Sequence, residues 1–301
     1  MRRRTMSDVK RNILITGATG QVGSAVIRAL KGGEGDDAIN LIAAGRSQET
    51  AATLGVAWRK LDYDDGSTMG PALQDIESVF MVTDYTVGML RQSKAFINAA
   101  KRAGVRHIVH LGAPGDDDTN VDHWGWHQFI ERYIEWSGFS FTHLRPEIFM
   151  QNLLGYGGAK PIKDGVIRHY VGDAKICWVD IDDIAAVAAE CLRDTSRHGG
   201  QTYRLGYDAK TYHEVATILS SATQQRFRYE ARPAAEFLEK VLAAGADYAY
   251  MQCAHNNYHN YATGKIPGAD YTFDNFETIT GRKPARWEDF AARHKSEFHY
   301  E

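Results

Sequence analysis

The chain of 301 residues is poor in cysteine, has no long apolar run and carries no excess of basic charge. Its three cysteines, Cys177, Cys191 and Cys253, are scattered, which excludes a metal-binding spacing and suits a reducing cytoplasm. No apolar stretch approaches the ~20 residues of a membrane span. The net charge of −3 leaves no basic surface for nucleic acid. We therefore expect a cytoplasmic protein with a small-molecule partner and neither a membrane nor a nucleic-acid partner.

The first residues are expected to hold no secretory signal, because apolar residues begin only at Ile13 and belong to a strand. The basic run at 2–4 precedes Met6 and is interpreted as a terminal tail or an upstream start. Cys177 and Cys191 lie in apolar runs, which indicates core packing.

A glycine-rich turn, Gly17-Ala18-Thr19-Gly20-Gln21-Val22-Gly23, separates an apolar run at 12–16 from a helical pattern at 24–30. Glycines let the backbone turn sharply and approach a ligand, and the following helix directs its N–H groups and positive dipole end at phosphates. Strand, turn and helix together predict a pyrophosphate site. A glycine-rich turn without a ligand is the alternative.

Strand and helix patterns alternate through the first half, which predicts an α/β fold with a doubly wound parallel sheet of Rossmann type. The expected strands are 12–16, 40–44, 57–61, 78–83, 107–111, 139–144 and 201–205. Apolar stripes predict helices that end near Gly104 and Gly138. The residues expected on the core faces of these two helices are Leu90, Phe96, Ile97 and Ala100, and Trp126, Phe129, Ile130, Tyr133 and Ile134. We expect a nucleotide-binding domain over 1–153, with 178–206 returning to the sheet. A smaller, mostly helical annex on the substrate side covers 154–177 and 207–301.

The spacing Gly-x-x-Gly-x-x-Gly resembles that of the extended and atypical short-chain dehydrogenases/reductases. Leu144-Arg145-Pro146-Glu147-Ile148-Phe149-Met150-Gln151-Asn152 and Val179-Asp180-Ile181-Asp182-Asp183-Ile184-Ala185 resemble signatures of the NmrA-like group. The resemblance covers the chain to about Glu230 and implies NAD(P)(H) as the cofactor.

Arg46 and Ser47 follow the second strand, where NAD-preferring folds place an acidic residue. A guanidinium and a hydroxyl suit a 2′-phosphate, so NADP(H) is the expected cofactor, with a solvated surface arginine as the alternative. Asp62 and Tyr63 are expected to flank the adenine or to serve the turn. Thr83 and Asp84 should lie near the nicotinamide ribose. The full set of expected cofactor contacts is Gly17, Thr19, Gly20, Gln21, Val22, Gly23, Arg46, Ser47, Asp62, Tyr63, Thr83, Asp84, Gly112, His127 and Pro146.

The superfamily resemblance implies a catalytic Ser and a Tyr-x-x-x-Lys pair, but this chain has Gly112-Ala113 and His123-x-x-x-His127 at those positions. The candidate catalytic residues are therefore His127, His123 and Tyr85. His127 would contact cofactor or substrate with Glu131 orienting its ring, and His123 would give a proton because histidine titrates near neutrality. Each histidine has the alternative of a structural role, and Tyr85 that of a packed tyrosine.

The pairs His123/His127 and His255/His259 share a spacing of four residues and together could form a zinc site. No cysteine is near them and a nucleotide fold needs no metal, so no metal is expected. The sequence thus predicts an NADPH-dependent oxidoreductase acting on an electrophilic, partly apolar molecule such as a quinone, enone, imine or conjugated aromatic. A non-enzymatic NADP(H)-binding redox sensor of the NmrA type is the alternative. The expected state is a monomer or homodimer.

Overall fold

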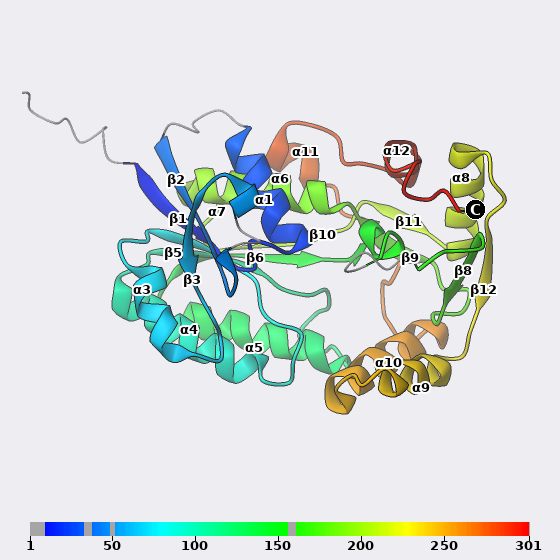
Figure 1. Cartoon of the computed structure of the whole chain (residues 1–301), viewed down its shortest axis with the longest axis horizontal. Helices are drawn as coiled ribbons and strands as arrows, with labels where there is room; N and C mark the ends of the chain where they lie inside the picture. The colour runs from blue at the N-terminus through cyan, green and yellow to red at the C-terminus, as the bar shows by residue number, and fades with distance from the viewer. Residues whose placement is uncertain (1–9, 33–37, 49–51, 156–160, 301) are drawn as a thin grey trace, which may run out of the picture. The chain divides into compact units, whose positions relative to one another are not determined.

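The fold is built on a parallel sheet, seen in a computed structural model that describes residues 10–32, 38–48, 52–155 and 161–300 (Figure 1). The basic run at 2–4, Met6, Gly157 and Gly158 lie outside the described residues. The seven-stranded sheet has the order β10-β6-β5-β4-β1-β2-β3, and strands β1 to β6 pair in parallel. Its strands are β1 (Arg11–Ile15), β2 (Ile39–Gly45), β3 (Ala57–Lys60), β4 (Ser78–Met81), β5 (His107–Leu111), β6 (Ser140–Pro146) and β10 (Gln201–Leu205). The expected α/β fold is confirmed.

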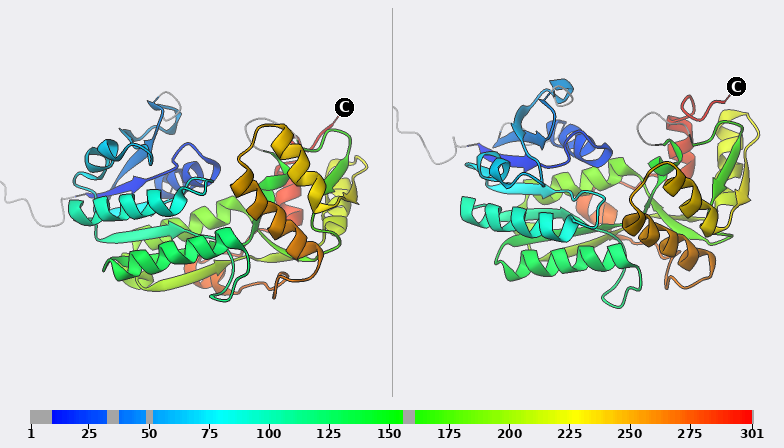
Figure 2. Two further views of the ribbon diagram at one scale, coloured as in Figure 1. Left: turned by 90° about the horizontal axis from the view of Figure 1, so that it is seen from below. Right: turned by 60° about the horizontal axis from the view of Figure 1, so that its bottom comes forward.

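Helices cover both faces of this sheet, and its central strands β4 and β5 are buried along their whole length (Figures 1 and 2). Figure 1 shows α3, α4 and α5 on one face and α1 and α6 on the other. The helices and 3-10 turns between these strands are α1 (Gln21–Lys31), η3 (Ala52–Leu54), η4 (Gly66–Thr68), α3 (Met69–Leu73), α4 (Met89–Ala103), α5 (Asp122–Trp136), α6 (Ile181–Arg193) and α7 (Thr195–His198). Gly104 ends α4 with φ +80, and Gly138 follows α5 with φ +83, as their glycine signals predict.

Two residues predicted for the core stripes of α4 and α5 lie on the outside instead. Phe129 is 69% exposed, and Leu90 is also exposed. Ile130 and Ile134 are buried against the sheet as expected. The apolar face of a helix is about 100° wide, and neighbouring residues point about 100° apart around the helix axis. Because Ile130 faces the sheet, its neighbour Phe129 points away from it. Trp124, which the stripe omitted, is buried.

The chain divides into two compact units. The first comprises Met1–Asp117, Trp124–Arg145 and Ile184–Tyr203, and the second Asp118–His123, Pro146–Asp183 and Arg204–Glu301. The predicted domain boundaries, 1–153 with 178–206 and 154–177 with 207–301, stay a prediction. From the segment 178–206, β10 joins the seven-stranded sheet, whereas the strand ending at Val179 belongs to a separate sheet.

The second unit holds more strand than the mostly helical pattern suggested. One small sheet has the order β11-β9-β7, and β12 pairs with β8. These segments are short, so their periodicity is a weak signal in the sequence. The strands are β7 (Ile148–Phe149), β8 (Val166–His169), β9 (Ile176–Val179), β11 (Asp208–Lys210) and β12 (Arg228–Ala231). The helices are η5 (Met150–Leu153), α8 (Tyr212–Thr223), α9 (Ala234–Ala243), α10 (Tyr248–Ala262), α11 (Asn275–Thr280) and α12 (Trp287–Arg293).

Cys177 and Cys191 are buried in β9 and α6, which confirms their predicted core role. Burial raises the pKa of the Cys177 thiol to about 12. Within the described ranges, no helix combines the length and the apolar character needed to cross a bilayer.

Candidate functional site

The glycine turn after β1 has the geometry of a phosphate-binding loop. Gly17 adopts φ +58, a left-handed conformation that side chains disfavour, and a Cβ there would lie 3.1 Å from the Val82 Cβ. Gly20 N–H donates to the Gly17 carbonyl at 2.9 Å. A Cβ on Gly23 would lie 2.3 Å from the Gly17 oxygen, so only glycine lets α1 start against the turn. The backbone conformation of Gly17 and the close contact at Gly23 therefore both require glycine.

The N-terminus of α1 is open to an anion. Gly20 is its N-cap, no side chain among the described residues caps it, and its first turn contains no acidic residue. Thr19, Gly20 and Gln21 are exposed there, whereas the Val22 side chain is buried and only its backbone faces the turn. This donor set fits a nucleotide pyrophosphate.

The carboxyl ends of the parallel strands meet at one edge of the sheet, which brings several predicted contacts together in the first unit. Arg46 and Ser47 follow β2 and are exposed. The Arg46 charge acts on Asp84, beyond β4, where it opposes the rise in pKa that burial causes. Arg46 also helps to lower the pKa of Asp64, whose main partner is Arg91 at 2.7 Å. The positive charge of Arg46 thus partly offsets the negative charges of Asp64 and Asp84.

Asp62 and Tyr63 are used by the protein itself. The Asp62 carboxylate accepts a bond from Asp64 N–H at 3.0 Å, which is the turn role that the sequence left open. The Tyr63 hydroxyl donates to the Val82 carbonyl at 2.8 Å, and its ring packs edge-on against Phe96 at 5.4 Å. Burial raises the pKa of this hydroxyl. Tyr63 thereby ties the ends of β3 and β4 together beside the glycine turn.

The segment after β4 contains three further candidates. Thr83 and Asp84 are half-buried, and Tyr85 is 77% exposed. The exposed Tyr85 is not the packed tyrosine that was its alternative role. Its place at the nicotinamide stays a prediction.

Gly112 follows β5 and lies over a buried ion pair. Its N–H donates to the Leu144 carbonyl at 2.8 Å, and a Cβ there would approach the Glu131 Oε1 to 3.2 Å. Glu131 is 0% exposed and accepts from Arg145 Nε at 3.0 Å and from Arg145 Nη2 at 2.5 Å. Arg145 Nη1 also donates to the Gly115 carbonyl at 2.9 Å. The ion pair therefore holds the loop after β5 against the sheet.

His127 is paired differently from our expectation. Its Nδ1 lies 3.3 Å from Nε2 of His110, a buried residue of β5. Glu131, the expected partner, has both carboxylate oxygens engaged by Arg145. Both residues lie on α5, and Arg145 of β6 binds the Glu131 carboxylate, so the orienting role of Glu131 stays a prediction. His110 was missed because it lies within the apolar strand run His107-Ile108-Val109-His110-Leu111; a polar residue inside such a run was the available signal.

His123 and Pro146 belong to the second unit. The His123 ring lies 6.3 Å from that of Tyr250, centroid to centroid. Burial lowers the pKa of His123 to about 4, so the ring is neutral near pH 7. The argument that His123 titrates near neutrality is therefore wrong for this environment. Pro146 ends β6 and is buried.

The second motif of the NmrA-like resemblance anchors the C-terminal segment. Asp180 accepts from Gln151 Nε2 at 2.6 Å and pairs with Arg293. Asp183 accepts from Ala285 N–H at 2.7 Å and pairs with Arg282 at 2.9 Å. These buried acids hold the chain around α12.

In the described part of the chain, one group of three residues could offer ligand atoms to a metal: His110, Glu131 and His143. The paired histidines of the sequence hypothesis are not among them. Both Glu131 oxygens already accept from Arg145, and its positive charge opposes a cation at this place. The donor set therefore does not fit a resident metal.

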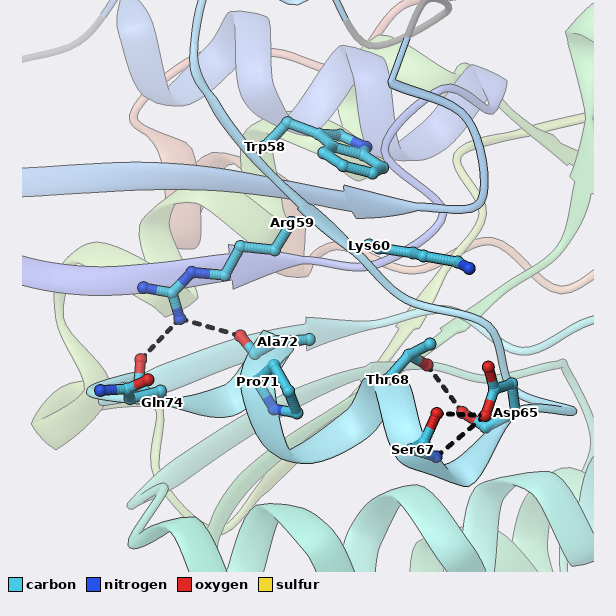
Figure 3. A pocket seen from close by; sticks show the side chains of 9 residues that line it. All are labelled: Trp58, Arg59, Lys60, Asp65, Ser67, Thr68, Pro71, Ala72 and Gln74. Atoms are coloured by element: carbon cyan, nitrogen blue, oxygen red, sulfur yellow. Dashed lines mark hydrogen bonds between the residues drawn. The ribbon is translucent and has the colours of Figure 1, made fainter.

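A hollow of about 540 Å³ lies beside β3 (Figure 3). Several of its polar groups bind one another or the backbone. Arg59 donates to the carbonyls of Ala72 at 3.0 Å and Gln74 at 2.5 Å, and Asp65 accepts from Ser67 at 2.6 Å. None of the predicted site residues lines the hollow.

A parallel sheet with a glycine turn before an uncapped helix defines a Rossmann-type nucleotide-binding protein. The NmrA-like family model matches residues 9–290, and the chain belongs to this family. NAD(P)H azoreductase of Xenophilus azovorans is 31% identical over 291 residues, covering 95% of this chain and 99% of that protein.

Solved structures agree with this assignment. The NADPH-dependent quinone oxidoreductase QOR2 of Escherichia coli, complexed with NADPH, is 26% identical with a TM-score of 0.76, covering 93% of this chain and 99% of that one. The Citrobacter sp. triphenylmethane reductase complexed with NADP(H) has a TM-score of 0.78 at 23% identity, covering 94% and 99%. Together the relationships support the general role of an NAD(P)H-dependent oxidoreductase, with NADP(H) as the cofactor class.

Proposed function

We propose that this protein is an NADPH-dependent reductase that acts on an electrophilic, partly apolar small molecule: a quinone, enone, imine or conjugated aromatic. The observation that carries the proposal is the glycine turn. Gly17 and Gly23 allow the tight turn against the start of α1, and Gly20 puts no side chain at the N-cap of this helix, where a pyrophosphate would bind. When bound, the nicotinamide supplies the hydride.

The substrate class follows from the chemistry that the chain offers. Conjugated acceptors take up a hydride without a strong protein acid, which suits a site whose His123 is neutral near pH 7. The relatives point the same way, because one is named an azoreductase and another a quinone oxidoreductase. The protein's part is then to place the acceptor and to exclude water.

The test is turnover of NADPH with a naphthoquinone, an azo dye and a triphenylmethane dye as separate acceptors. We expect loss of NADPH absorbance with at least one of them, in proportion to protein concentration. Binding of NADPH without turnover of any acceptor would instead favour the redox-sensor alternative. Unequal affinity for NADPH and NADP⁺ would add to that conclusion.

We further propose that Arg46 binds the 2′-phosphate of NADPH. Losing a charge-assisted hydrogen bond costs about 1.5–3 kcal/mol, so Arg46→Ala should weaken NADPH binding roughly ten- to a hundredfold. NADH affinity should stay nearly unchanged, because NADH lacks that phosphate. Isothermal titration with both cofactors measures the difference. Equal losses for the two would assign Arg46 to another role.

His127 is proposed to contact the nicotinamide ribose or the substrate. His127→Ala should then lower kcat/KM at least tenfold, about 1.4 kcal/mol. The melting temperature should move little, because the ring is only half-buried. The matched control on the same helix is Phe129→Ala, whose exposed side chain leaves activity unchanged. A large loss of stability with normal kinetics would mark His127 as a structural histidine.

A further inference from the structure

We propose that His110 is a positioning residue that accepts the Nδ1 proton of His127 and so fixes the tautomer and orientation of the His127 ring. The inference rests on the proposed function for its effect on the reaction. The hydrogen bond itself can be measured without cofactor or substrate.

His110 is a rigid support for such a bond. It lies in β5, which has β4 on one side and β6 on the other, in register with Met81 and His143. Its side chain is fully buried, and its Nε2 lies 3.3 Å from Nδ1 of His127. The two ring centroids are 5.4 Å apart with planes at 35°. A half-buried ring on α5 is therefore held by a ring that has no room to turn.

The surroundings keep His110 neutral. Burial lowers its pKa to about 3, and the positive charge of Arg145 acts in the same direction. His143, opposite on β6, is also buried with its pKa lowered to about 2 by burial, and His110 itself contributes to that shift. Glu131 on α5 is the nearby negative group, and Arg145 neutralises it. The buried site already holds the positive charge of Arg145, and His110 therefore stays neutral beside it.

A neutral His110 bears one ring proton, so only one nitrogen of the His110–His127 pair donates in their hydrogen bond. A carboxylate oxygen of Glu131 lies within 4.8 Å of a ring nitrogen of His110. His110 Nδ1 is buried and has no hydrogen-bond partner among the described residues. With the single proton of the neutral His110 ring on Nδ1, its Nε2 is left to accept from His127. This direction also persists when His127 is a cation, since a cationic His127 can only donate.

The consequence for the site is a defined His127. With its proton held on Nδ1, His127 keeps Nε2 as the nitrogen that accepts, or carries the second proton when the ring is charged. Glu131 and Arg145 influence His127 only indirectly. Their ion pair lies close to His110, and the positive charge of Arg145 helps to keep His110 neutral. The geometry thus gives the Nδ1 of His127 a buried, neutral histidine as its neighbour.

Long-range nitrogen–proton NMR of the histidine rings tests the bond directly in the full chain without cofactor. We expect the neutral His127 ring to carry its proton on Nδ1. In His110→Phe, which cannot accept, the His127 proton should move to Nε2, and in His110→Gln, whose amide oxygen accepts, it should stay on Nδ1. His127→Ala identifies the signals. An Nε2 proton on His127 in the wild-type protein overturns the proposal without any variant having to fold.

A double-mutant cycle tests the effect on the reaction. We expect His110→Phe to lower kcat/KM about tenfold and His110→Gln to restore most of that loss. In the His127→Ala background, His110→Phe should change kcat/KM less than twofold, because it acts through His127. Multiplicative losses in the double variant overturn the positioning role. If the tautomer moves as expected but His127→Ala keeps full activity, the hydrogen bond stands and the proposed role of His127 in the site is rejected.

Discussion

Gly20→Val is expected to lower NADPH affinity at least a hundredfold while the protein stays folded. The valine side chain would occupy the space over the N-terminus of α1, whereas the backbone conformation of Gly20 is one that valine can adopt. Gly20 has φ −77, so a side chain meets no backbone strain there, whereas the strained glycine is Gly17, with φ +58. A Cβ at Gly20 would lie 3.2 Å from the Gly17 oxygen, a tight contact that a small shift relieves. The valine methyl groups would then fill the space over the N-terminus of α1, where a pyrophosphate must approach the backbone.

Calorimetric titration of NADPH measures this loss, and circular dichroism reports the fold. The control is Gly70→Val on α3, where an added Cβ meets no atom within 4 Å, so NADPH affinity should be retained. Gly23→Ala is a useful contrast. Its Cβ would lie 2.3 Å from the Gly17 oxygen, so it should lower the melting temperature as well as the affinity. A folded Gly20→Val that binds NADPH normally would place the cofactor elsewhere.

The sheet was predictable because its signals are local. Each strand of the first half is a short apolar run, and Gly104 and Gly138 mark helix ends by the same left-handed backbone that the structure shows. The glycine turn was predictable for the same reason, since Gly17, Gly20 and Gly23 lie within one strand–turn–helix segment. A local pattern fixes local geometry when few alternatives fit it.

The partners of the candidate residues could not be predicted, because they come from strands far away in the sequence. Helical spacing favoured Glu131 as the partner of His127, but Arg145 arrives from β6 and binds both carboxylate oxygens. His110 arrives from β5 and meets His127 instead. Spacing along one helix says which residues share a face, and it does not say which tertiary neighbour competes for them. Most of the small strands of the second unit were missed because each is four residues or shorter.

Buried histidines should make the protein acid-sensitive well above the range where carboxylates titrate. His107, His110 and His143 lie inside β5 and β6 and are almost fully buried. Burial lowers their pKa values to about 4, about 3 and about 2. Their ordinary pKa in an unfolded chain is about 6.5. The stability that they contribute as neutral groups is complete above pH 6.5, and it is lost as the pH falls below that value because only the unfolded chain then binds protons.

The size of this effect follows from the linkage. Burial also lowers the pKa values of His123 and His169 to about 4, so they act in the same direction. At pH 5 an unfolded histidine of pKa about 6.5 gains about 2 kcal/mol by protonation, so the five together reduce the free energy of unfolding by about 10 kcal/mol. Asp183 has the opposite sign, since burial raises its pKa to about 6 and the folded state binds its proton first. Protonation of Asp183 in the folded state therefore adds about 1–2 kcal/mol to the free energy of unfolding at pH 5. The remaining loss of about 8 kcal/mol is a large part of the ~5–15 kcal/mol that stabilises a typical protein.

Urea unfolding between pH 7.5 and pH 5 tests this, with the free energy of unfolding plotted against pH. We expect a decline that begins near pH 6.5 and a net uptake of about three to four protons on unfolding below it. His143→Gln should remove one of these protons and make the decline shallower by about 1.4 kcal/mol per pH unit, whatever it does to the stability at pH 7.5. His259→Gln, at an exposed position of α10, should leave the slope as it is. A free energy of unfolding that stays constant down to pH 5 would mean that these buried rings are protonated in the folded protein, and the neutral His110 on which the positioning of His127 depends would be lost with them.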